Sequence, residues 1–299
     1  MIACATNPDF VFDPKRKRSP HLFPDRPSLA RSRAALARAG LSDCHFCAHH
    51  CGVNRLRGER GRCHASAETR FFSAQTEVGD ERELLPTFAV ALSGCDMRCD
   101  FCITGRESWN PAAGIAFDCA TMAARARRAL ARGAVTIQLL GGEPTIHLPA
   151  ALEFAAALPG DATLVWKTNG HGSAEARQLL EGIFDVWVAD FKFGNEACAR
   201  RLSSTPDYLP AVQENLRWAS RHTELILRHV LLPGHVECCW QPIAEWLGDV
   251  LPGVKVSLRT GFWPGWHSAR HRELCGTITR AESERAFEVA RSIGLNLIS

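Results

Sequence analysis

The stretch TFAVALSGCDMRCDFC, residues 87–102, joins an apolar run to a loop that contains three cysteines. The run 87–94 has the apolar and β-branched residues of a buried strand. Cys95, Cys99 and Cys102 follow it directly, with the spacing CxxxCxxC. A closed zinc site takes four ligands and a disulfide takes two, so a set of three thiols needs another explanation.

The strand pattern of 87–94 recurs five more times along the chain, at 134–142, 162–170, 184–192, 223–234 and 253–261. Stretches of helical character follow these runs, at 118–132, 149–158, 173–182, 194–221, 240–250 and 280–293. This alternation is typical of parallel strands joined by crossover helices. The part of the chain from residue 86 onward is shorter than the about 250 residues of a complete eight-unit barrel. We therefore expect an α/β fold, a partial (β/α)6 barrel over residues 86–299.

Two further segments precede the predicted barrel. Residues 1–26 are rich in proline and basic residues, and 27–39 have a helical pattern that Gly40 can terminate, so 1–40 is predicted to be an irregular arm and a helix. Residues 41–85 contain four cysteines among glycine, histidine and arginine. This composition predicts a cysteine-rich N-terminal metal-binding segment.

The composition is that of an ordinary globular protein, with 46% hydrophobic and 22% charged residues. The net charge of +3 is too small to indicate a nucleic-acid or membrane partner. Residues 1–12 lack the pattern of a signal peptide, and no apolar run reaches the about 20 residues that span a bilayer. Of the thirteen cysteines, four lie between 44 and 63 and three between 95 and 102, while the other six are scattered: Cys4, Cys119, Cys198, Cys238, Cys239 and Cys275. The clustering of the first seven favours metal or cluster ligands in a reducing compartment over disulfides. We therefore expect a cytoplasmic protein.

Three thiolates in one tight loop can hold a cubane iron–sulfur cluster and leave one iron without a protein ligand. An open coordination position suits a catalytic metal, whereas closed sites tend to be structural. Two alternatives remain for the loop. The three thiols could bind zinc together with Cys119, or they could be unrelated.

The sequence GGEP, residues 141–144, stands at the end of the second predicted strand. A CxxxCxxC loop followed one βα unit later by GGEP resembles the signature pair of the radical S-adenosylmethionine (radical SAM) superfamily. The resemblance implies that the three cysteines bind a [4Fe–4S] cluster, whose open iron binds the amino and carboxylate groups of S-adenosylmethionine. It further assigns the amino group to Gly141, Gly142 and Glu143, and the adenine to Phe101.

Three later motifs extend the resemblance: TNG (168–170), DFK (190–192) and RHVLLPG (228–234). They are similar to the motif series of the glycyl-radical-enzyme activases, a branch related to the pyruvate formate-lyase activating enzyme. By this resemblance the cofactor site includes Thr168, Asn169, Asp190, Lys192 and Arg228, with Lys192 and Arg228 on the cofactor carboxylate. All these motifs stand at or just past the ends of predicted strands, the face on which parallel barrels build active sites.

One residue departs from that branch. Its members often have an aspartate before TNG that helps to bind a monovalent cation, and this chain has Lys167. The sequence therefore leaves a cation site undecided.

The segment CHFCAHHCGVNRLRGERGRC, residues 44–63, contains Cys44, Cys47, Cys51 and Cys63. Four cysteines form a closed ligand set for a second [4Fe–4S] cluster or for zinc. In a zinc site a neighbouring histidine could replace a thiol; the candidates are His45, His49, His50 and His64. The segment resembles the N-terminal part of the PflX-like subgroup of activase-related proteins. That resemblance leaves the substrate open.

The family resemblance implies an oxidoreductase that cleaves S-adenosylmethionine reductively to a 5′-deoxyadenosyl radical. The activase-like branch implies that the radical takes hydrogen from a protein or peptide, with an electron donor such as flavodoxin or ferredoxin. A radical enzyme acting on a small metabolite is the alternative, and a non-catalytic zinc or iron–sulfur protein a more distant one. Trp263, Trp266 and His267 follow the sixth predicted strand and either contact the substrate or pack the open side of the barrel.

Overall fold

The computed structural model describes residues 25–79 and 81–298 of the chain. Residues 1–24 of the predicted arm lie outside the described part. One sheet of nine strands, in the order β3-β1-β2-β4-β5-β6-β7-β8-β9, forms the centre of the fold. The strands are β1 (Arg70–Glu77), β2 (Thr87–Leu92), β3 (Ile115–Ala116), β4 (Thr136–Gly141), β5 (Thr163–Thr168), β6 (Val186–Asp190), β7 (Glu224–Val230), β8 (Lys255–Arg259) and β9 (Asn296–Leu297).

In the part of the sheet order that runs β2-β4-β5-β6-β7-β8-β9, each strand pairs in parallel with the next. Only β1 pairs antiparallel, with β2 on one side and β3 on the other. The six predicted strand segments correspond to β2, β4, β5, β6, β7 and β8. Because β3 and β9 are the ends of the sheet order, the sheet does not close. The chain therefore has an α/β fold with an open, mostly parallel sheet, as a partial barrel requires.

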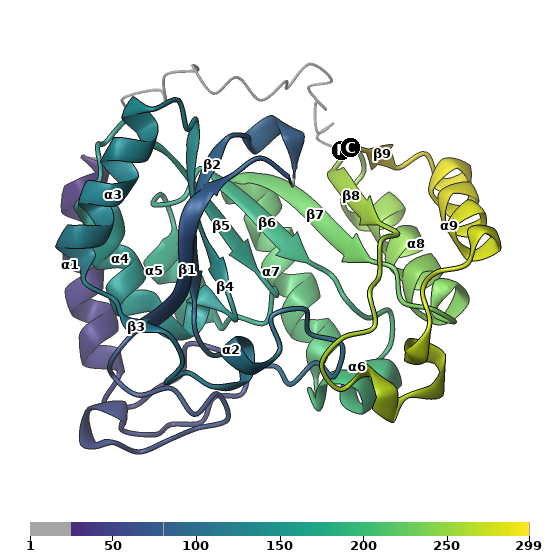
Figure 1. Ribbon diagram of the computed structural model, residues 1–299, viewed down its shortest axis with the longest axis horizontal. Coiled ribbons are helices and arrows are strands. Elements are labelled where there is room, and N and C mark those ends of the chain that lie inside the picture. The colour runs from purple at the N-terminus through teal and green to yellow at the C-terminus, as the bar shows by residue number, and fades with distance from the viewer. Residues whose placement is uncertain (1–24, 80, 299) are drawn as a thin grey trace, which may run out of the picture.

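The helices are α1 (Arg26–Gly40), α2 (Arg106–Trp109), α3 (Cys119–Ala131), α4 (Leu148–Ala156), α5 (Ala174–Leu180), α6 (Glu196–Ser203), α7 (Tyr208–His222), α8 (Gln241–Val250) and α9 (Arg280–Ile293). Figure 1 shows the sheet curving through the molecule, with α3, α4 and α5 beside one half and α8 and α9 beside the other. The N-terminal helix α1 packs on α4.

One helix prediction was wrong, because 194–221 forms two helices, α6 and α7. Ser204 has a left-handed backbone with φ of 52°. Thr205 precedes Pro206, and a residue before proline is disfavoured in the helical conformation. The chain therefore turns between the two helices.

The two faces of the parallel strands differ because side chains alternate along each strand. Outward-facing residues such as Trp166 and Trp187 are buried in the main core under the helices. Val165, Val188 and Ile226 form a second, smaller cluster. Further along the strands, the inward positions become polar; they include Lys167, Asp190, Arg228 and Arg259. The C-terminal ends of the strands therefore frame a charged surface.

The cysteine-rich segment lies against the same ends of the strands. Cys47 forms an isolated β-bridge with Gly172, just past β5. The N–H of Ala48 donates to the carbonyl of His171 at 3.0 Å, and the N–H of Ser173 donates to Phe46 at 3.1 Å. Figure 1 shows these loops below the strands, near α2. No helix in the described part of the chain is long and apolar enough to cross a membrane.

Candidate active site

Two residues, Ser93 and Gly94, separate the end of β2 from Cys95, the first cysteine of the three-cysteine loop. Cys95 and Cys99 are buried and Cys102 is half-buried. The N–H of Met97 donates to the Cys95 sulfur at 3.4 Å, and the Thr104 hydroxyl lies 3.3 Å from the Cys102 sulfur. Cys95 and Cys99 interact electrostatically, as do Cys99 and Cys102. The three predicted cluster ligands therefore lie in one loop, near enough to interact electrostatically, although within residues 25–79 and 81–298 they are not among the groups whose ligand atoms all lie within 4.8 Å of one another.

The C-terminal end of helix α6 holds this loop through two backbone hydrogen bonds. The N–H of Arg98 donates to the carbonyl of Ser203 at 3.0 Å, and that of Asp100 donates to Leu202 at 2.9 Å. Burial raises the pKa of Cys95 well above its usual value and that of Cys99 to about 12. Free thiols at these positions stay protonated at neutral pH, whereas a metal ion favours the thiolate.

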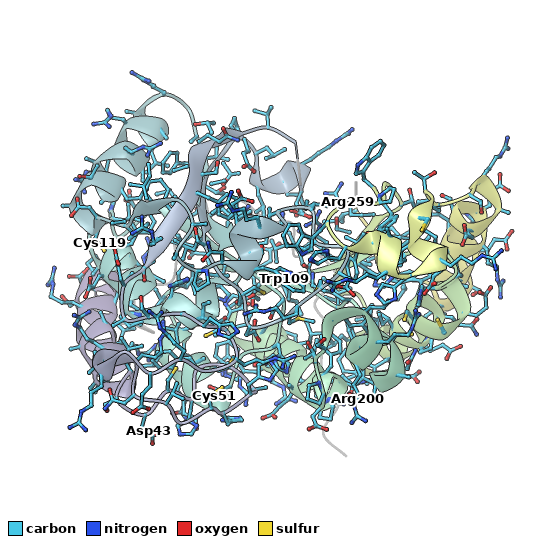
Figure 2. All side chains as sticks on the ribbon, turned by 60° about the horizontal axis from the view of Figure 1, so that its bottom comes forward. Asp43, Cys51, Trp109, Cys119, Arg200 and Arg259 are labelled. Atoms are coloured by element: carbon cyan, nitrogen blue, oxygen red, sulfur yellow. The ribbon has the colours of Figure 1, made fainter. Side chains whose placement is uncertain are left out.

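Cys119 does not join the loop. It lies on α3, where its sulfur contacts the Ala150 carbonyl at 3.7 Å and the Glu153 carboxylate at 3.6 Å, both on α4. Figure 2 shows Cys119 at the side of the molecule, away from Trp109 near the centre of the view. A zinc site made of the three loop cysteines and Cys119 is therefore wrong.

The two glycines of GGEP let the end of β4 lie directly on the backbone before the cysteine loop. The N–H of Gly142 donates to Leu92 and the N–H of Glu143 to the Gly94 carbonyl, each at 2.8 Å. A Cβ atom on Gly142 would stand 1.8 Å from that Gly94 oxygen, and one on Gly141 would stand 2.2 Å from the Leu92 nitrogen. Only glycine fits at this close approach.

The Glu143 carboxylate is buried and ties two strand ends together. One oxygen accepts from the Thr145 N–H at 3.0 Å, from the Thr145 hydroxyl at 2.5 Å and from the Thr168 hydroxyl at 2.8 Å. The other accepts from the Asn169 N–H at 2.7 Å. Burial, together with the negative charge of Asp96, raises the pKa of Glu143 to about 7. The glutamate therefore joins GGEP to TNG, two of the predicted cofactor motifs.

Asp96, within the cysteine loop, is the centre of a buried polar group. Its carboxylate accepts from Asn169 Nδ2 at 2.7 Å and lies 2.8 Å from His171 Nδ1. His49, from the N-terminal cysteine segment, bonds to the Asp96 carbonyl at 3.1 Å. Burial alone would raise the pKa of Asp96, but the hydrogen bond from His171 and the nearby histidines hold it below its usual value. Asp96 therefore links the loop to TNG and to the upstream segment.

Lys192 and Asp190 of DFK form an ion pair at the end of β6. Lys192 also interacts electrostatically with Cys99, and its backbone N–H donates to the Tyr208 hydroxyl at 2.7 Å. Burial opposes both charges, but the pairing keeps the pKa of Asp190 below and the pKa of Lys192 above its usual value. Asp190 Oδ1 is buried and has no hydrogen-bond partner among the described residues.

A buried carboxylate from outside the predicted motifs, Glu81, faces the cations on the inner surface. Its oxygens lie 3.3 Å from Lys167 Nζ, 3.3 Å from Arg259 Nη2 and 3.7 Å from Arg228 Nε. Lys167, the residue directly before TNG, therefore pairs with a carboxylate from the β1–β2 connection. Arg228 stands at the predicted face but points to Glu81 in this structure.

The aromatic segment after β8 lies beside the loop. The N–H of His267 donates to the Asp100 carbonyl at 2.8 Å. Trp266 packs edge-on against Trp109 of α2, with ring centres 5.7 Å apart. Phe101, the predicted adenine neighbour, is buried edge-on against Phe193 at 6.0 Å.

The four upstream cysteines line one small cavity. Cys44, Cys47, Cys51 and Cys63 surround an empty volume of about 290 Å³, part of it open to solvent. Three of these sulfurs accept hydrogen bonds: Cys44 from Arg55 at 3.6 Å, Cys51 from the Arg62 N–H at 3.3 Å and Cys63 from the Ala65 N–H at 3.5 Å. Within residues 25–79 and 81–298, these cysteines are not among the groups whose ligand atoms all lie within 4.8 Å of one another.

Sequence reasoning missed several polar residues of this face: Glu81, Asp96, His171 and Tyr208. Asp96 lies inside the cysteine motif and His171 directly after TNG, so the sequence could have predicted both as site residues. Glu81 could not have been predicted, because it reaches the site from a loop that contains no motif.

The residues present fit an iron–sulfur cluster and S-adenosylmethionine. Three neighbouring sulfurs supply the ligands that a cubane with one open iron requires. The partnerless oxygen of Asp190 can accept from an ammonium or hydroxyl group of the cofactor. Lys192 supplies a positive charge near the same loop for a carboxylate.

Comparison with known proteins gives the family. A sequence model of the radical SAM superfamily matches residues 90–247, just over half of the chain. The uncharacterized protein MJ0674 of Methanocaldococcus jannaschii is 29% identical over 285 residues, which are 91% of this chain and 81% of the relative.

Comparison with solved structures gives one likeness in fold and one weaker match. SuiB of Streptococcus suis, crystallised with its precursor peptide SuiA, has a TM-score of 0.53 and 16% identity over 68% of this chain. The chain covers 46% of SuiB, less than half of that protein. A domain of pyruvate-formate lyase-activating enzyme from Bacteroides vulgatus has a TM-score of 0.43 and 14% identity, covering 54% of this chain and 96% of the domain. With the family model matching from β2 to α8, the chain belongs to the radical SAM superfamily.

Proposed function

We propose that the protein is an activase-like radical SAM enzyme whose substrate is a protein or peptide. The observation that carries the radical chemistry is the set of three neighbouring sulfurs, Cys95, Cys99 and Cys102, at the C-terminal ends of a parallel sheet. A [4Fe–4S] cluster held by these three cysteines would supply the one-electron reduction of bound S-adenosylmethionine, with a flavodoxin- or ferredoxin-like protein as the electron donor. That chemistry would provide a radical able to take a hydrogen atom from the substrate.

The chain's own residues hold the reactants in place. Lys192 and Arg228 bind the cofactor carboxylate, which requires each to leave part of its present pairing with Asp190 or Glu81. Asp190 accepts a hydrogen bond through its partnerless oxygen. Glu143 positions the cofactor motifs, because the four hydrogen bonds that its carboxylate accepts hold TNG beside GGEP. The backbone of Gly141 and Gly142 lies close enough to the loop to meet the amino group.

Phe101 stays the proposed neighbour of the adenine. Its ring lies in the loop itself, immediately before Cys102, and Phe193 fixes it from the side. An aromatic ring there shields the reacting bond from water and supports a flat base by stacking.

A protein or peptide substrate is supported by exposed apolar side chains around the loop. Ile103, directly after Cys102, is 82% exposed, Trp263 is 71% exposed and Trp266 is 41% exposed. The segment that carries the two tryptophans is held to Asp100 of the loop. Exposed large apolar groups beside an active site favour contact with a macromolecule.

The upstream cysteines hold a second iron–sulfur cluster in this proposal. A single zinc ion would hold its four ligand atoms close together, whereas the sulfurs of Cys44, Cys47, Cys51 and Cys63 are not a group that lies within 4.8 Å of one another. N–H donors to cluster sulfurs tune such clusters, and three of these cysteines have donors. Asp96 interacts electrostatically with Cys47 and Cys63 as well as with Cys95. The second cluster would therefore neighbour the first and can relay electrons to it.

The radical chemistry is tested by anaerobic reconstitution with iron and sulfide, followed by dithionite and S-adenosylmethionine. Formation of 5′-deoxyadenosine is expected, and Cys99→Ala should abolish it. Wild-type protein with a full iron complement that forms no 5′-deoxyadenosine would refute the proposal.

The substrate class is tested with extract from the source cells. Dialysed extract should stimulate 5′-deoxyadenosine formation, and protease treatment of that extract should remove the stimulation. Stimulation found only in the dialysate would instead assign a small metabolite.

A further inference from the structure

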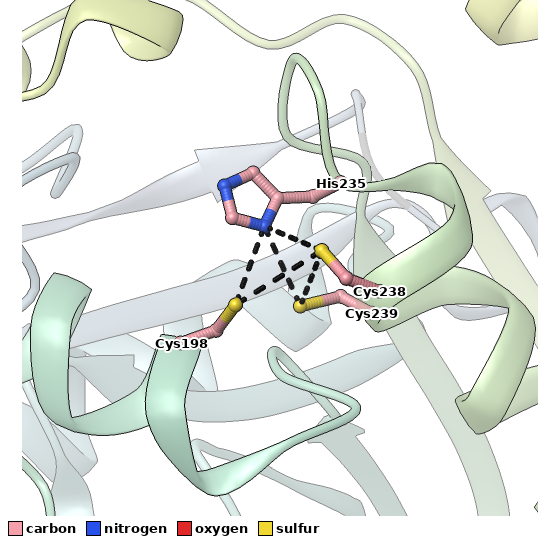
Figure 3. A group of neighbouring side chains, drawn as sticks. All are labelled: Cys198, His235, Cys238 and Cys239. Atoms are coloured by element: carbon pink, nitrogen blue, oxygen red, sulfur yellow. Dashed lines mark hydrogen bonds between the residues drawn. The ribbon is translucent and has the colours of Figure 1, made fainter.

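Four metal-ligand side chains converge at a place that the radical chemistry does not use. Cys198 lies on α6, His235 directly before the short π-helix Val236–Trp240, and Cys238 and Cys239 within it. His235 Nδ1 is 3.6 Å from the Cys198 sulfur, 3.2 Å from Cys238 and 3.6 Å from Cys239. The Cys238 sulfur is 4.0 Å from Cys198 and 3.9 Å from Cys239. Figure 3 shows three sulfurs and one ring nitrogen pointing at a common centre.

These separations are those of one tetrahedral ion. With Zn–S bonds of about 2.3 Å and Zn–N bonds of about 2.0 Å, a tetrahedron puts two sulfurs about 3.8 Å apart and a sulfur and a nitrogen about 3.5 Å apart. All four ligand atoms lie within 4.8 Å of one another. A disulfide needs sulfurs about 2 Å apart, and a cubane spreads its cysteines over several irons. The upstream cysteines, Cys44, Cys47, Cys51 and Cys63, are not such a compact group.

The surroundings supply the outer contacts of a bound metal. Asn195 Nδ2 donates to the Cys198 sulfur at 3.2 Å and reaches the Cys239 sulfur at 3.8 Å. On the other side of the imidazole, His235 Nε2 is 3.8 Å from the Glu273 carboxylate, which also pairs with Arg201. A carboxylate behind a metal-bound histidine orients its ring and strengthens its basicity.

The backbone is shaped for this convergence. Gly194 lies so close to Cys239 that an added Cβ would stand 2.3 Å from the Cys239 carbonyl oxygen. The π-helical turn places Cys238 and Cys239, adjacent in sequence, both within reach of His235. Single π-turns of this kind occur often at functional sites.

We propose that Cys198, His235, Cys238 and Cys239 bind a structural zinc ion. Three thiolates and one imidazole fill the four positions of Zn²⁺, so the site is closed and takes no substrate. The ion fastens α6 to the turn before α8. Because the carbonyls of Leu202 and Ser203 on α6 hold the three-cysteine loop, the zinc stabilises the platform of the radical site.

Zinc content and X-ray absorption of the full chain test the proposal. Wild-type protein purified from zinc-containing medium should hold one zinc per chain, with an absorption spectrum fitted by three sulfurs and one nitrogen. Cys238→Ser should lose most of the zinc. The matched control, Cys275→Ser, changes another exposed cysteine outside the group and should keep it.

Three results would overturn the zinc site. The first is wild-type protein without zinc. The second is zinc retained in Cys238→Ser, which would place the ion at the upstream cysteines. The third is mass spectrometry that finds any of Cys198, Cys238 and Cys239 in a disulfide. The wild-type spectrum decides even if the variant fails to fold. Because the readout is zinc, failure here leaves the 5′-deoxyadenosine test of the proposed function unaffected.

Discussion

Replacing Gly142 with alanine tests how GGEP positions the cysteine loop. The new Cβ would start 1.8 Å from the Gly94 carbonyl oxygen, so opening the contact to 3.0 Å takes a displacement of about 1.2 Å. The same oxygen accepts the Glu143 N–H, so the shift also strains that hydrogen bond. Overpacking of this kind costs about 1–3 kcal/mol. Because Gly94 directly precedes Cys95, moving the Gly94 backbone also moves the first cysteine of the cluster loop.

The assay is the initial rate of 5′-deoxyadenosine formation by reconstituted protein, with iron per chain and melting temperature measured in parallel. A misplacement of about 1 Å at a reacting centre can cost about 100-fold in rate, and a loss of that size is expected here. Gly261→Ala is the matched control. It lies just past β8, and a Cβ added there would have no atom within 4 Å, so its rate should stay within about twofold of wild type. A Gly142→Ala protein with wild-type melting temperature and rate would refute the reasoning.

Three further outcomes are expected. Cys119→Ser should leave iron content and 5′-deoxyadenosine formation unchanged, because Cys119 contacts α4 and not the cysteine loop. Loss of either would show that Cys119 is a ligand of the metal at that loop. Asn169→Ala removes a donor to the buried Asp96 carboxylate, which should cost about 1.5–3 kcal/mol of stability and lower the melting temperature; an unchanged value would contradict that bond. Burial, followed by the charge of Arg55, lowers the pKa of His147 to about 4 from 6.5. Between pH 6.5 and 4, His147 therefore binds a proton in the unfolded chain but stays neutral in the folded chain. The free energy of unfolding should fall by up to about 3 kcal/mol as the pH drops through that window. Melting curves of wild type and His147→Gln against pH check this, since the variant should lack that part of the loss.

The parallel part of the fold was predictable because each strand and crossover helix has its own local pattern. The runs at 87–94 and 184–192 are apolar and bounded by turn residues, and both became strands. β1 was not predicted, since its residues are at most half-buried and lack a clear alternation. The division of 194–221 depended on one left-handed residue, Ser204, before Thr205-Pro206.

The site divides in the same way. The motifs at 95–102 and 141–144 could be found because their residues are close in sequence. The ion pairs of Glu81 could not, because its partner Arg259 is far along the chain and only the fold brings the two together. Cys198, Cys238 and Cys239 look scattered in the sequence for the same reason. Cys198 and Cys238 are separated by a strand and a helix that no spacing rule connects.

The central claim is that the cluster held by Cys95, Cys99 and Cys102 has one iron that binds S-adenosylmethionine directly. Electron–nuclear double resonance of the reduced protein, with S-adenosylmethionine isotope-labelled in its amino group, tests this most directly. The account predicts a resolved coupling between the cluster and the labelled nitrogen in wild-type protein and none in Cys99→Ala. A reduced, fully loaded wild-type cluster that shows no such coupling would contradict it.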